Sequence, residues 1–209
     1  MKASVASCRI IVLARAPEPG EVKTRLIPAL GADGAAALHR RLVRHSLRAA
    51  QEAALGPVEL WCAPDARHIF FQECARAFGV SLHSQGVGDL GERMRRAVEA
   101  ALTRAGRVIL VGSDIPALSS QYLRDAERAL GSNHDVVIGP AEDGGYVLIG
   151  LARADGELFR GIPWGGSEVL KETRLRIAAL GWRGLELPAL WDADRPEDLE
   201  RLPEKMRVF

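Results

Sequence analysis

Two cations follow the first apolar segment of this chain, within residues 14–26, which read ARAPEPGEVKTRL. Two prolines and a glycine make an irregular, stiff loop, and Lys23 and Arg25 then flank Thr24. Exposed backbone amides and two cations are suited to binding phosphate oxygens, and Arg15 can add a third cation. A basic surface turn would explain the same residues, because the Gly-Lys-Ser/Thr ending of a Walker loop is absent. Both interpretations of this loop stay open on spacing alone.

An acidic residue follows another apolar segment, in the stretch VGSDIPAL of residues 111–118. Asp114 falls where the apolar run ends, and Pro116 stops the chain from continuing straight. Mg²⁺ and Mn²⁺ prefer carboxylate oxygens, taking one or two from the protein and further oxygens from phosphates. Asp114 is therefore a candidate metal ligand, although an Asp in a turn that bonds its own backbone is common.

A third loop, GPAEDGG at residues 139–145, again follows an apolar segment. Asp-Gly between two apolar runs predicts a hairpin turn, and the glycines also allow a ligand to approach the backbone. We favour the turn, with Asp143 as a candidate catalytic base and Glu142 as the alternative to it.

The segment WDADRPEDLERL at residues 191–202 contains two further carboxylates that could ligate a metal, Asp192 and Asp194. A helix cap explains the same pattern, because Asp194 with Glu197 three residues later resembles a capping box. The choice between a metal ligand and a cap for Asp194 stays open.

Apolar segments and helical patterns alternate along the chain. The strands are predicted at Ile10–Ala14, Val58–Cys62, Val80–His83, Val108–Val111, Asp135–Ile138, Tyr146–Leu151 and Arg183–Leu187. The helices are predicted at Gly31–Leu55, His68–Phe78, from a capping box at Asp89 and Glu92 onward, and at Leu118–Leu130, Ser167–Leu180 and Pro196–Leu202. This alternation predicts a three-layer α/β/α fold with a mostly parallel central sheet, in a single domain covering residues 1–209. Ligands of such sheets bind outside the carboxyl ends of the strands, where the loops above lie.

The composition of the chain limits the classes of binding partner that can be expected. The chain has 209 residues, 28 Lys plus Arg against 27 Asp plus Glu, and a net charge of +1, which argues against bulk binding to nucleic acid or to an anionic membrane. The apolar run of residues 8–14 is too short to span a bilayer, so no membrane span is expected. Cys8, Cys62 and Cys74 lack ligand-like spacing and indicate reduced thiols. We therefore expect a cytoplasmic protein.

Six segments of the sequence, taken together, match the pattern of a known family. ARAPEPGEVKTRL, GDLGERM, GSDIPAL, GPAEDGGYVLIGL, IPWGGSEVL and WDADRPEDL occur in this order, between about Ile10 and about Leu202. The set resembles the bacterial family termed selenodomain-associated transferase 1, a GT-A-like family labelled glycosyltransferase. That family is distantly similar to 2-phospho-lactate guanylyltransferase and molybdenum-cofactor guanylyltransferase.

The resemblance implies a nucleotide-diphospho-sugar transferase (GT-A) fold that uses Mg²⁺ or Mn²⁺. It implies that Lys23 and Arg25 face the donor phosphates, that Asp114 binds the metal, and that Asp194 matches a second metal aspartate. The full set of expected nucleotide contacts is Ala14, Arg15, Lys23, Arg25, Gly88, Asp89, Arg93 and Ser113.

This chain departs from the pattern of its relatives at two places. Arg195 stands where related tails carry a Thr that caps the helix, so Asp194 could be the cap instead. Gly165 and Gly166 stand where relatives tend to have a hydroxyl residue, which is missing here or shifted to Ser167.

Three functions remain open from the sequence. A glycosyltransferase would move a sugar from a nucleotide-sugar to a small acceptor, with Asp143 as base. A nucleotidyltransferase would join a nucleoside triphosphate to a phosphorylated acceptor with release of pyrophosphate, and cations on the first loop suit its triphosphate. A catalytically inactive nucleotide-binding domain is the third. The base, the sugar, the acceptor and the oligomeric state are not determined by the sequence.

Overall fold

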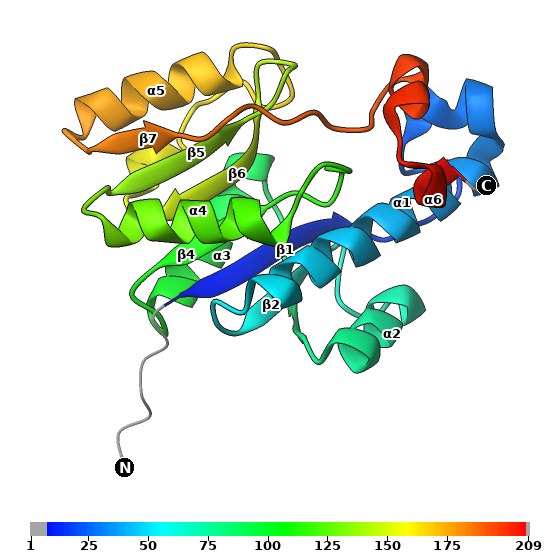
Figure 1. Cartoon of the computed structure of the whole chain (residues 1–209), viewed down its shortest axis with the longest axis horizontal. Coiled ribbons are helices and arrows are strands. Elements are labelled where there is room, and N and C mark those ends of the chain that lie inside the picture. The colour runs from blue at the N-terminus through cyan, green and yellow to red at the C-terminus, as the bar shows by residue number, and fades with distance from the viewer. Residues whose placement is uncertain (1–7, 208–209) are drawn as a thin grey trace.

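The computed structural model describes residues 8–207, so the predicted domain of residues 1–209 extends beyond the described part at both ends. Within the described part, the strands form a seven-stranded sheet in the order β3-β2-β1-β4-β6-β5-β7 (Figure 1). Only β6 in this sheet runs antiparallel to its neighbours, which confirms the prediction of a mostly parallel sheet. The strands are β1 (Arg9–Arg15), β2 (Val58–Ala63), β3 (Ser81–Ser84), β4 (Val108–Val111), β5 (Val136–Pro140), β6 (Tyr146–Leu151) and β7 (Gly184–Glu186).

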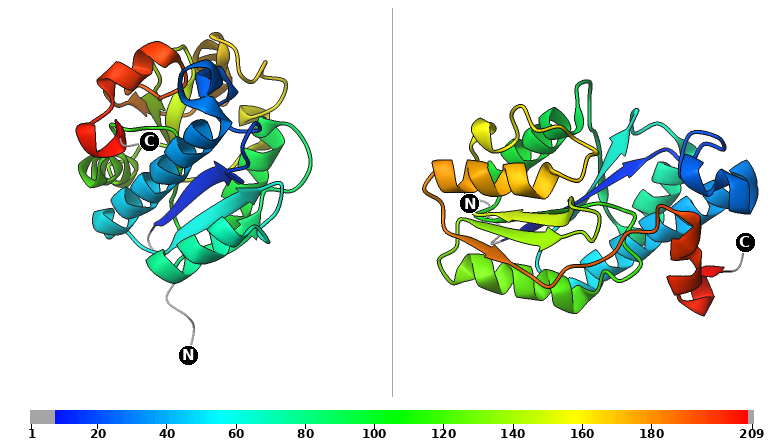
Figure 2. Two further views of the ribbon diagram at one scale, coloured as in Figure 1. Left: turned by 90° about the vertical axis from the view of Figure 1, so that its right-hand side faces the viewer. Right: turned by 90° about the horizontal axis from the view of Figure 1, so that it is seen from above.

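Helices cover both faces of the sheet, as the predicted three-layer arrangement requires (Figure 2). One face is covered by α1 (Ile27–Ala53), α2 (Ile69–Phe78) and α4 (Ser120–Gly131). The other is covered by α3 (Leu90–Leu102) and α5 (Val169–Ala179). No helix within residues 8–207 is long and apolar enough to cross a membrane.

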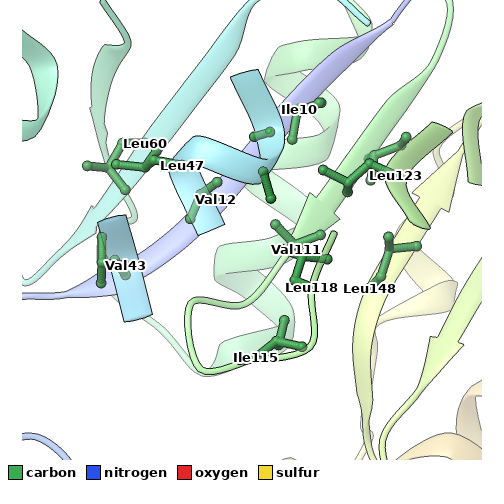
Figure 3. Close-up of a cluster of buried hydrophobic side chains, with 14 of the residues drawn as sticks. Ile10, Val12, Val43, Leu47, Leu60, Val111, Ile115, Leu118, Leu123 and Leu148 are labelled. Carbon is green, nitrogen blue, oxygen red and sulfur yellow. The ribbon is translucent and has the colours of Figure 1, made fainter. Parts of the chain in front are cut away.

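The central strand β1 is buried on both faces because its alternate side chains enter two different apolar clusters. Ile10 and Val12 pack toward α1 and α4, where Leu47 is among their neighbours (Figure 3). Ile11 and Leu13 pack on the other face with residues of α3. Full burial of each such side chain stabilises the fold by about 1.5–3 kcal/mol. This explains why the strand reads as a continuous apolar run rather than an alternating pattern.

The helix α1 begins earlier than the predicted start at Gly31. Gly31 has φ 70° and ψ 169°, so the chain turns sharply there between a first turn and the long regular part of the helix. Only glycine adopts such angles without strain, because it lacks a Cβ. The sequence therefore identified the regular helix, but not the short turn of residues 27–30 before it.

The predicted capping box of α3 is confirmed. The Asp89 carboxylate accepts a hydrogen bond from the Glu92 backbone N–H at 2.8 Å, and the Glu92 carboxylate accepts one from the Asp89 N–H at 3.2 Å. Both bonds satisfy backbone donors that a helix start leaves unpaired.

The predicted hairpin between β5 and β6 is also confirmed. The two strands pair antiparallel, and the turn between them contains Gly144 with φ 92°. A Cβ at Gly144 would lie 2.2 Å from the Ser167 carbonyl oxygen, so the turn packs tightly on the segment before α5. The hairpin loop is thereby fixed beside the segment of residues 164–167.

A third apolar cluster joins the C-terminal segment to the beginning of α1. It contains Leu26, Ala35, Leu38, Leu42, Ala193, Leu202 and Met206. The predicted short helix of residues 196–202 is a 3₁₀ helix, η3 (Pro196–Arg201), and the short α6 (Glu204–Arg207) follows it without having been predicted. Figure 1 shows this segment, in red, beside the blue start of α1. The cluster thus brings residues near 194 close to residues near 25.

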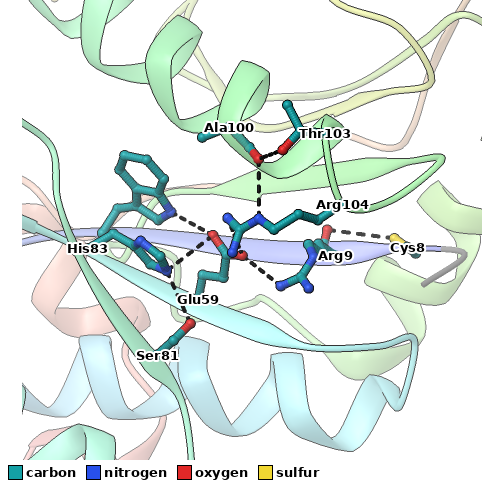
Figure 4. Close-up of polar contacts among 9 residues, drawn as sticks. Cys8, Arg9, Glu59, Ser81, His83, Ala100, Thr103 and Arg104 are labelled. Atoms are coloured by element: carbon teal, nitrogen blue, oxygen red, sulfur yellow. Dashed lines mark hydrogen bonds and ion pairs between the residues drawn. The ribbon is translucent and has the colours of Figure 1, made fainter. Parts of the chain in front are cut away.

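A buried carboxylate lies near the amino ends of β1 and β2 and links these two strands (Figure 4). Glu59 is fully buried, and it accepts bonds from Arg9 Nη1 at 2.8 Å and Trp61 Nε1 at 3.0 Å. Arg104 Nη2 lies 3.0 Å and His83 Nε2 lies 3.6 Å from its oxygens. We refer to these five side chains as the Glu59 cluster.

Candidate active site

A cleft of about 640 Å³ lies at the carboxyl ends of the central strands. Its walls come from the loops after β1, β3 and β4, from the β5–β6 turn, and from the segments near residues 165 and 193. The sheet rule predicted this position, because ligands of open α/β sheets bind at these strand ends. The loops selected from the sequence therefore meet at one cleft.

Two cations and two carboxylates form a chain of ion pairs in the middle of the cleft. Lys23 Nζ lies 2.9 Å from Asp114 Oδ2 and 3.8 Å from Asp194 Oδ1. Arg25 Nη1 lies 2.5 Å from Asp194 Oδ2. We refer to these four side chains as the cleft cluster. The structure thus brings together four of the predicted site residues from three distant parts of the sequence.

Lys23 is held deep in this cluster by an uncommon backbone conformation. Its φ of 50° and ψ of 40° are left-handed, which is uncommon for any residue other than glycine. Its side chain is only 3% exposed, whereas the side chains of Asp114 and Asp194 are 40% and 34% exposed. The ammonium group is therefore enclosed while the two carboxylates stay accessible from the cleft.

His39 of α1 also contacts Asp114, and the sequence did not predict this. Its Nε2 lies 3.0 Å from the Arg15 carbonyl oxygen, so Nε2 carries the hydrogen, because a carbonyl can only accept. Its Nδ1 lies 3.4 Å from Asp114 Oδ1. Desolvation alone would raise the pKa of Asp114, but Lys23 and His39 outweigh it and hold that pKa well below its ordinary value. Asp114 is thus an anion poised to bind a cation.

Asp194 is not the helix cap that the sequence left open. Asp198, rather than Glu197, supplies the capping carboxylate, accepting from the backbone N–H of Asp194 at 3.0 Å and of Arg195 at 2.7 Å. Arg195 is the N-cap position of η3, so the absence of a capping Thr there is compensated by Asp198. The predicted pairing of Asp194 with Glu197 is therefore wrong, and the carboxylate of Asp194 faces Lys23 and Arg25.

Backbone bonding fixes the second aspartate against the first. The N–H of Ala193 donates to the Asp114 carbonyl oxygen at 2.9 Å, and Ala193 is fully buried in the third apolar cluster. The loop after β4 and the C-terminal segment therefore hold Asp114 and Asp194 in fixed relation.

One end of the cleft is acidic. Asp143 and Asp192 both line it, and the backbone N–H of Gly145 donates to Asp143 Oδ1 at 2.9 Å. Burial and the nearby charge of Asp143 raise the pKa of Asp192 above its ordinary value, against the opposing effect of Lys23. Two carboxylates that repel each other favour a ligand that brings hydrogen-bond donors or positive charge.

Glu142, the alternative base, is engaged elsewhere. Arg201 donates to both of its carboxylate oxygens, at 2.8 and 2.9 Å, and holds the pKa of Glu142 below its ordinary value. Glu142 does not line the cleft, which leaves Asp143 as the candidate base in this loop.

The predicted nucleotide contacts divide into two groups. Six of them line the cleft, namely Ala14, Arg15, Lys23, Arg25, Arg93 and Ser113. Gly88 and Asp89 do not, because the Asp89 carboxylate caps α3 and the Gly88 carbonyl oxygen accepts from Arg93 Nε at 2.9 Å. These two residues shape the loop before α3 rather than the cleft surface.

Sequence reasoning did not predict His39 or Gln85 as residues of the cleft, whereas Trp164, beside Gly165 and Gly166, could be expected over an acceptor pocket and does line the cleft. The indole N–H of Trp164 is buried without a hydrogen-bond partner, and a Cβ at Gly91 would lie 2.5 Å from that nitrogen. For Trp164, the sequence signal is Gly91, the second glycine of the GDLGERM segment, because the absence of a side chain there allows the tryptophan to pack against α3.

The cleft carboxylates fit a hard divalent cation in kind. Within residues 8–207, no three His, Cys, Asp or Glu side chains converge on a complete metal site. Mg²⁺ and Mn²⁺ are commonly held by one or two carboxylates together with substrate phosphates, however. Asp114 and Asp194 supply that smaller set, since both approach the same ammonium group and both remain accessible.

Known proteins share this architecture. A protein from Desulfovibrio desulfuricans G20, described as a candidate nucleotide-diphospho-sugar transferase, is 34% identical, with a TM-score of 0.80 over 90% of this chain and 82% of that one. A nucleotidyl transferase from Methanothermobacter is 17% identical, with a TM-score of 0.67 over 96% and 97% of the two chains. Glucosyl-3-phosphoglycerate synthase from Mycobacterium tuberculosis, solved with Mn²⁺ and UDP, is 13% identical, with a TM-score of 0.57 over 92% and 74%.

The fold and these likenesses define the architecture of the chain as that of the nucleotide-diphospho-sugar transferases. Residues 46–166 match the model of the DUF2064 family, described as an uncharacterized protein conserved in bacteria, and the chain belongs to that family. A search of curated proteins finds no match.

Proposed function

We propose that this protein is a metal-dependent glycosyltransferase that moves a sugar from a nucleotide-sugar to a small acceptor. The observation that carries this proposal is the division of the cleft. Its middle has Lys23 and Arg25 beside two accessible carboxylates, and its end toward the β5–β6 turn has Asp143 and Asp192. The first part suits a nucleoside diphosphate, and the second suits an acceptor that brings hydroxyl groups.

The proposed reaction follows from these residues. Mg²⁺ or Mn²⁺, held by Asp114 and Asp194, would neutralise the donor phosphates when bound. Lys23 and Arg25 stabilise the negative charge that grows on the departing nucleoside diphosphate. Asp143 accepts the proton of the acceptor hydroxyl while the acceptor oxygen bonds to the sugar carbon and the bond from that carbon to the phosphate oxygen breaks.

The main alternative is a nucleotidyltransferase, which several proteins of the same fold are. The sequence favours this alternative because the first loop carries several cations, and a triphosphate has more negative charge than a diphosphate. In the structure, Lys23 and Arg25 are each paired with a carboxylate, so little positive charge is left uncompensated, and a triphosphate needs more of it than a diphosphate does. A phosphorylated acceptor would also meet the carboxylates of Asp143 and Asp192, which repel it. Both observations favour the glycosyltransferase.

The test combines ligand binding with product analysis. Thermal stability is measured with Mn²⁺ and a panel of nucleoside triphosphates, nucleoside diphosphates and nucleotide-sugars. A ligand present at about 100 times its dissociation constant stabilises by roughly 2.7 kcal/mol, which shifts the midpoint by several degrees. Wild type is compared with Asp114→Asn and with Asp125→Asn, a control at a surface acid of α4 that pairs with Arg128.

The outcomes separate the three functions. Metal-dependent stabilisation by one nucleotide-sugar, lost only in Asp114→Asn, together with slow release of nucleoside diphosphate, supports the glycosyltransferase. Stabilisation by a triphosphate with release of pyrophosphate indicates the nucleotidyltransferase. Binding without turnover in the presence of varied acceptors, with the same biological activity in Asp114→Asn as in wild type, indicates an inactive nucleotide-binding domain.

A further inference from the structure

The side chain of Gln85, just after β3, lies across the ends of two neighbouring strands. Its Nε2 donates to the Ala14 carbonyl oxygen at 3.1 Å and to the Trp61 carbonyl oxygen at 2.8 Å. Arg96 of α3 holds the backbone here by donating to the carbonyl oxygens of Gln85 and Val87. The residue is only 4% exposed, yet it lines the cleft.

These contacts fix which way the carboxamide faces. Carbonyl oxygens accept hydrogen bonds and cannot donate them, so the amide nitrogen must face Ala14 and Trp61. The amide oxygen, Oε1, then faces away from the strands, and no donor within residues 8–207 is hydrogen-bonded to it. Oε1 is therefore an acceptor of fixed orientation, on a nearly buried residue at the cleft wall, and it is available to a donor group of a ligand.

The position of Gln85 along the sheet edge identifies the part of the ligand that it meets. The strand order places β2 and β1 on one side of β4, and β6 and β5 on the other. Lys23 lies on the loop after β1 and Asp114 on the loop after β4. The acidic end of the cleft lies farther along the sheet edge, at the β5–β6 turn. Strands are about 4.8 Å apart, so Gln85 is one to two strand spacings from the phosphate position, on the side away from the acidic end. A nucleotide whose phosphates lie at the cleft cluster would bring its nucleoside to Gln85.

Besides Arg15 and Arg93, the residues of β1 and α3 that line the cleft with Gln85 include apolar side chains. Leu13 and Met94 are buried there, and Leu90 lines the same cleft with 44% of its surface exposed. A sugar hydroxyl normally needs several polar partners, whereas a flat base needs an apolar surface and a few fixed polar groups. The combination of an exposed leucine with one oriented acceptor suits a base better than a ribose.

We propose that Gln85 reads the nucleobase of the donor, with Oε1 accepting a hydrogen bond from an N–H group on the pairing edge of the base. This inference rests on the proposed function, since it requires a nucleotide in the cleft. Gln85 is thereby a specificity-determining residue, and its Nε2 bonds to Ala14 and Trp61 keep the acceptor from turning over.

The test uses paired ligands and a paired variant. Binding of UDP, GDP, CDP and ADP is measured with Mn²⁺ by calorimetry. The tightest of the four is then compared with its analogue methylated at the N–H groups of the pairing edge, and with its 2′-deoxy analogue. Wild type is compared with Gln85→Leu and with the control Gln72→Leu, which removes an exposed carboxamide that donates to the Ala66 carbonyl oxygen outside the cleft.

Base methylation is expected to weaken binding by about tenfold in wild type and in Gln72→Leu, and by less than twofold in Gln85→Leu. If Gln85→Leu does not fold, Gln85→Met, which has similar length and no acceptor, takes its place. Equal loss on methylation in all variants would overturn the base contact while leaving nucleotide binding intact. The base contact would also be overturned if Gln85→Leu changed only the loss of affinity caused by the 2′-deoxy substitution, and not the loss caused by base methylation. Failure of all four diphosphates to bind would overturn the proposed function, and the base contact with it.

Discussion

The Glu59 cluster and the cleft cluster lie toward opposite ends of the central strands, and both pair carboxylates with cationic side chains. Glu59 is fully buried, and two arginines, a tryptophan and a histidine surround its carboxylate. Asp114 and Asp194 also pair with cations, but more than a third of each side chain remains exposed. In the Glu59 cluster the enclosed group is the carboxylate, whereas in the cleft cluster the enclosed group is the ammonium group of Lys23.

This difference separates a structural ion cluster from a binding site. An enclosed carboxylate whose oxygens are all engaged can only stabilise or destabilise the fold. Accessible carboxylates around an enclosed ammonium group can exchange partners when a cation or phosphate arrives. Exposure of the acid, rather than the number of ion pairs, therefore distinguishes the site, and the following predictions test that distinction.

The largest expected effect on stability is at Glu59. Glu59→Gln removes the negative charge from among Arg9, Arg104 and His83, and we expect the free energy of unfolding to fall by about 3–5 kcal/mol. Urea denaturation measures this. The exposed pair of Glu73 with Arg44 supplies the control, and Glu73→Gln is expected to cost less than about 1 kcal/mol. Nucleotide binding by folded Glu59→Gln should equal that of wild type, and a loss of binding would contradict the separation of the two clusters.

A smaller loss of stability is expected at Lys23. Lys23→Met leaves Asp114 and Asp194 without their shared cation, but both acids are partly hydrated, so the expected cost is about 1–3 kcal/mol. Mn²⁺ without nucleotide should then raise the melting temperature of Lys23→Met more than that of wild type, because the lysine no longer competes for the carboxylates. Equal shifts in the two proteins would argue against a metal at Asp114 and Asp194.

The cap that holds Asp194 in place should contribute less again. Asp198→Ala removes the acceptor for the backbone N–H groups of Asp194 and Arg195, and we expect a loss of about 1 kcal/mol. Arg195→Thr is the matched substitution, and it should change stability by less than about 0.5 kcal/mol because Asp198 still caps the helix. Reversed magnitudes in chemical denaturation would mean that residue 195 supplies the cap.

The smallest effect, at neutral pH, concerns two thiols near the two ends of the strands. Cys8 lies beside Arg9 at one end, and Cys62 lies near the cleft, where its carbonyl oxygen accepts a hydrogen bond from the Gln85 N–H. Burial raises the pKa of each thiol to about 12. Because the folded-state pKa lies above the unfolded value of 9.0, stability is unaffected below pH 9 and falls as the pH rises from there toward 12.

Alkylation at pH 8, followed by mass spectrometry of the peptides, should therefore find both thiols unreactive until the protein is unfolded. Faster reaction at Cys62 than at Cys8 would contradict this, and would indicate that the cleft end opens more readily than the enclosed end.

Local pattern accounts for much of the fold. Apolar runs such as Ile10–Ala14 are strands, and a capping pair such as Asp89 and Glu92 starts a helix, because both depend on neighbours within a few residues. Boundaries differ by one or a few residues at several ends, where capping and kinks rather than apolar periodicity decide. Gly31 is the largest such case, since its turn is formed by backbone angles that no local pattern specified.

The candidate site was only partly predictable. Lys23, Arg25, Asp114 and Asp194 stood out because loops at strand ends are where ligands bind, and these loops carried charge. His39 did not, because it lies inside an ordinary amphipathic helix and meets Asp114 only through tertiary packing. Gln85 followed a weak strand and carried no charge. Its importance depends on two carbonyl oxygens from other strands, which no sequence spacing indicates.

The C-terminal segment has a consequence for how the protein is made. The contact of Arg25 with Asp194 joins residues 169 positions apart, and the apolar cluster of Leu26, Ala193 and Met206 holds the two segments together. During translation, β1 to β6 emerge and can pair well before residue 194 leaves the ribosome, and β7 (Gly184–Glu186) emerges only shortly before it. Binding competence is therefore acquired at the end of folding, and a chain cut short near residue 190 would retain its strands while being unable to complete its ligand site.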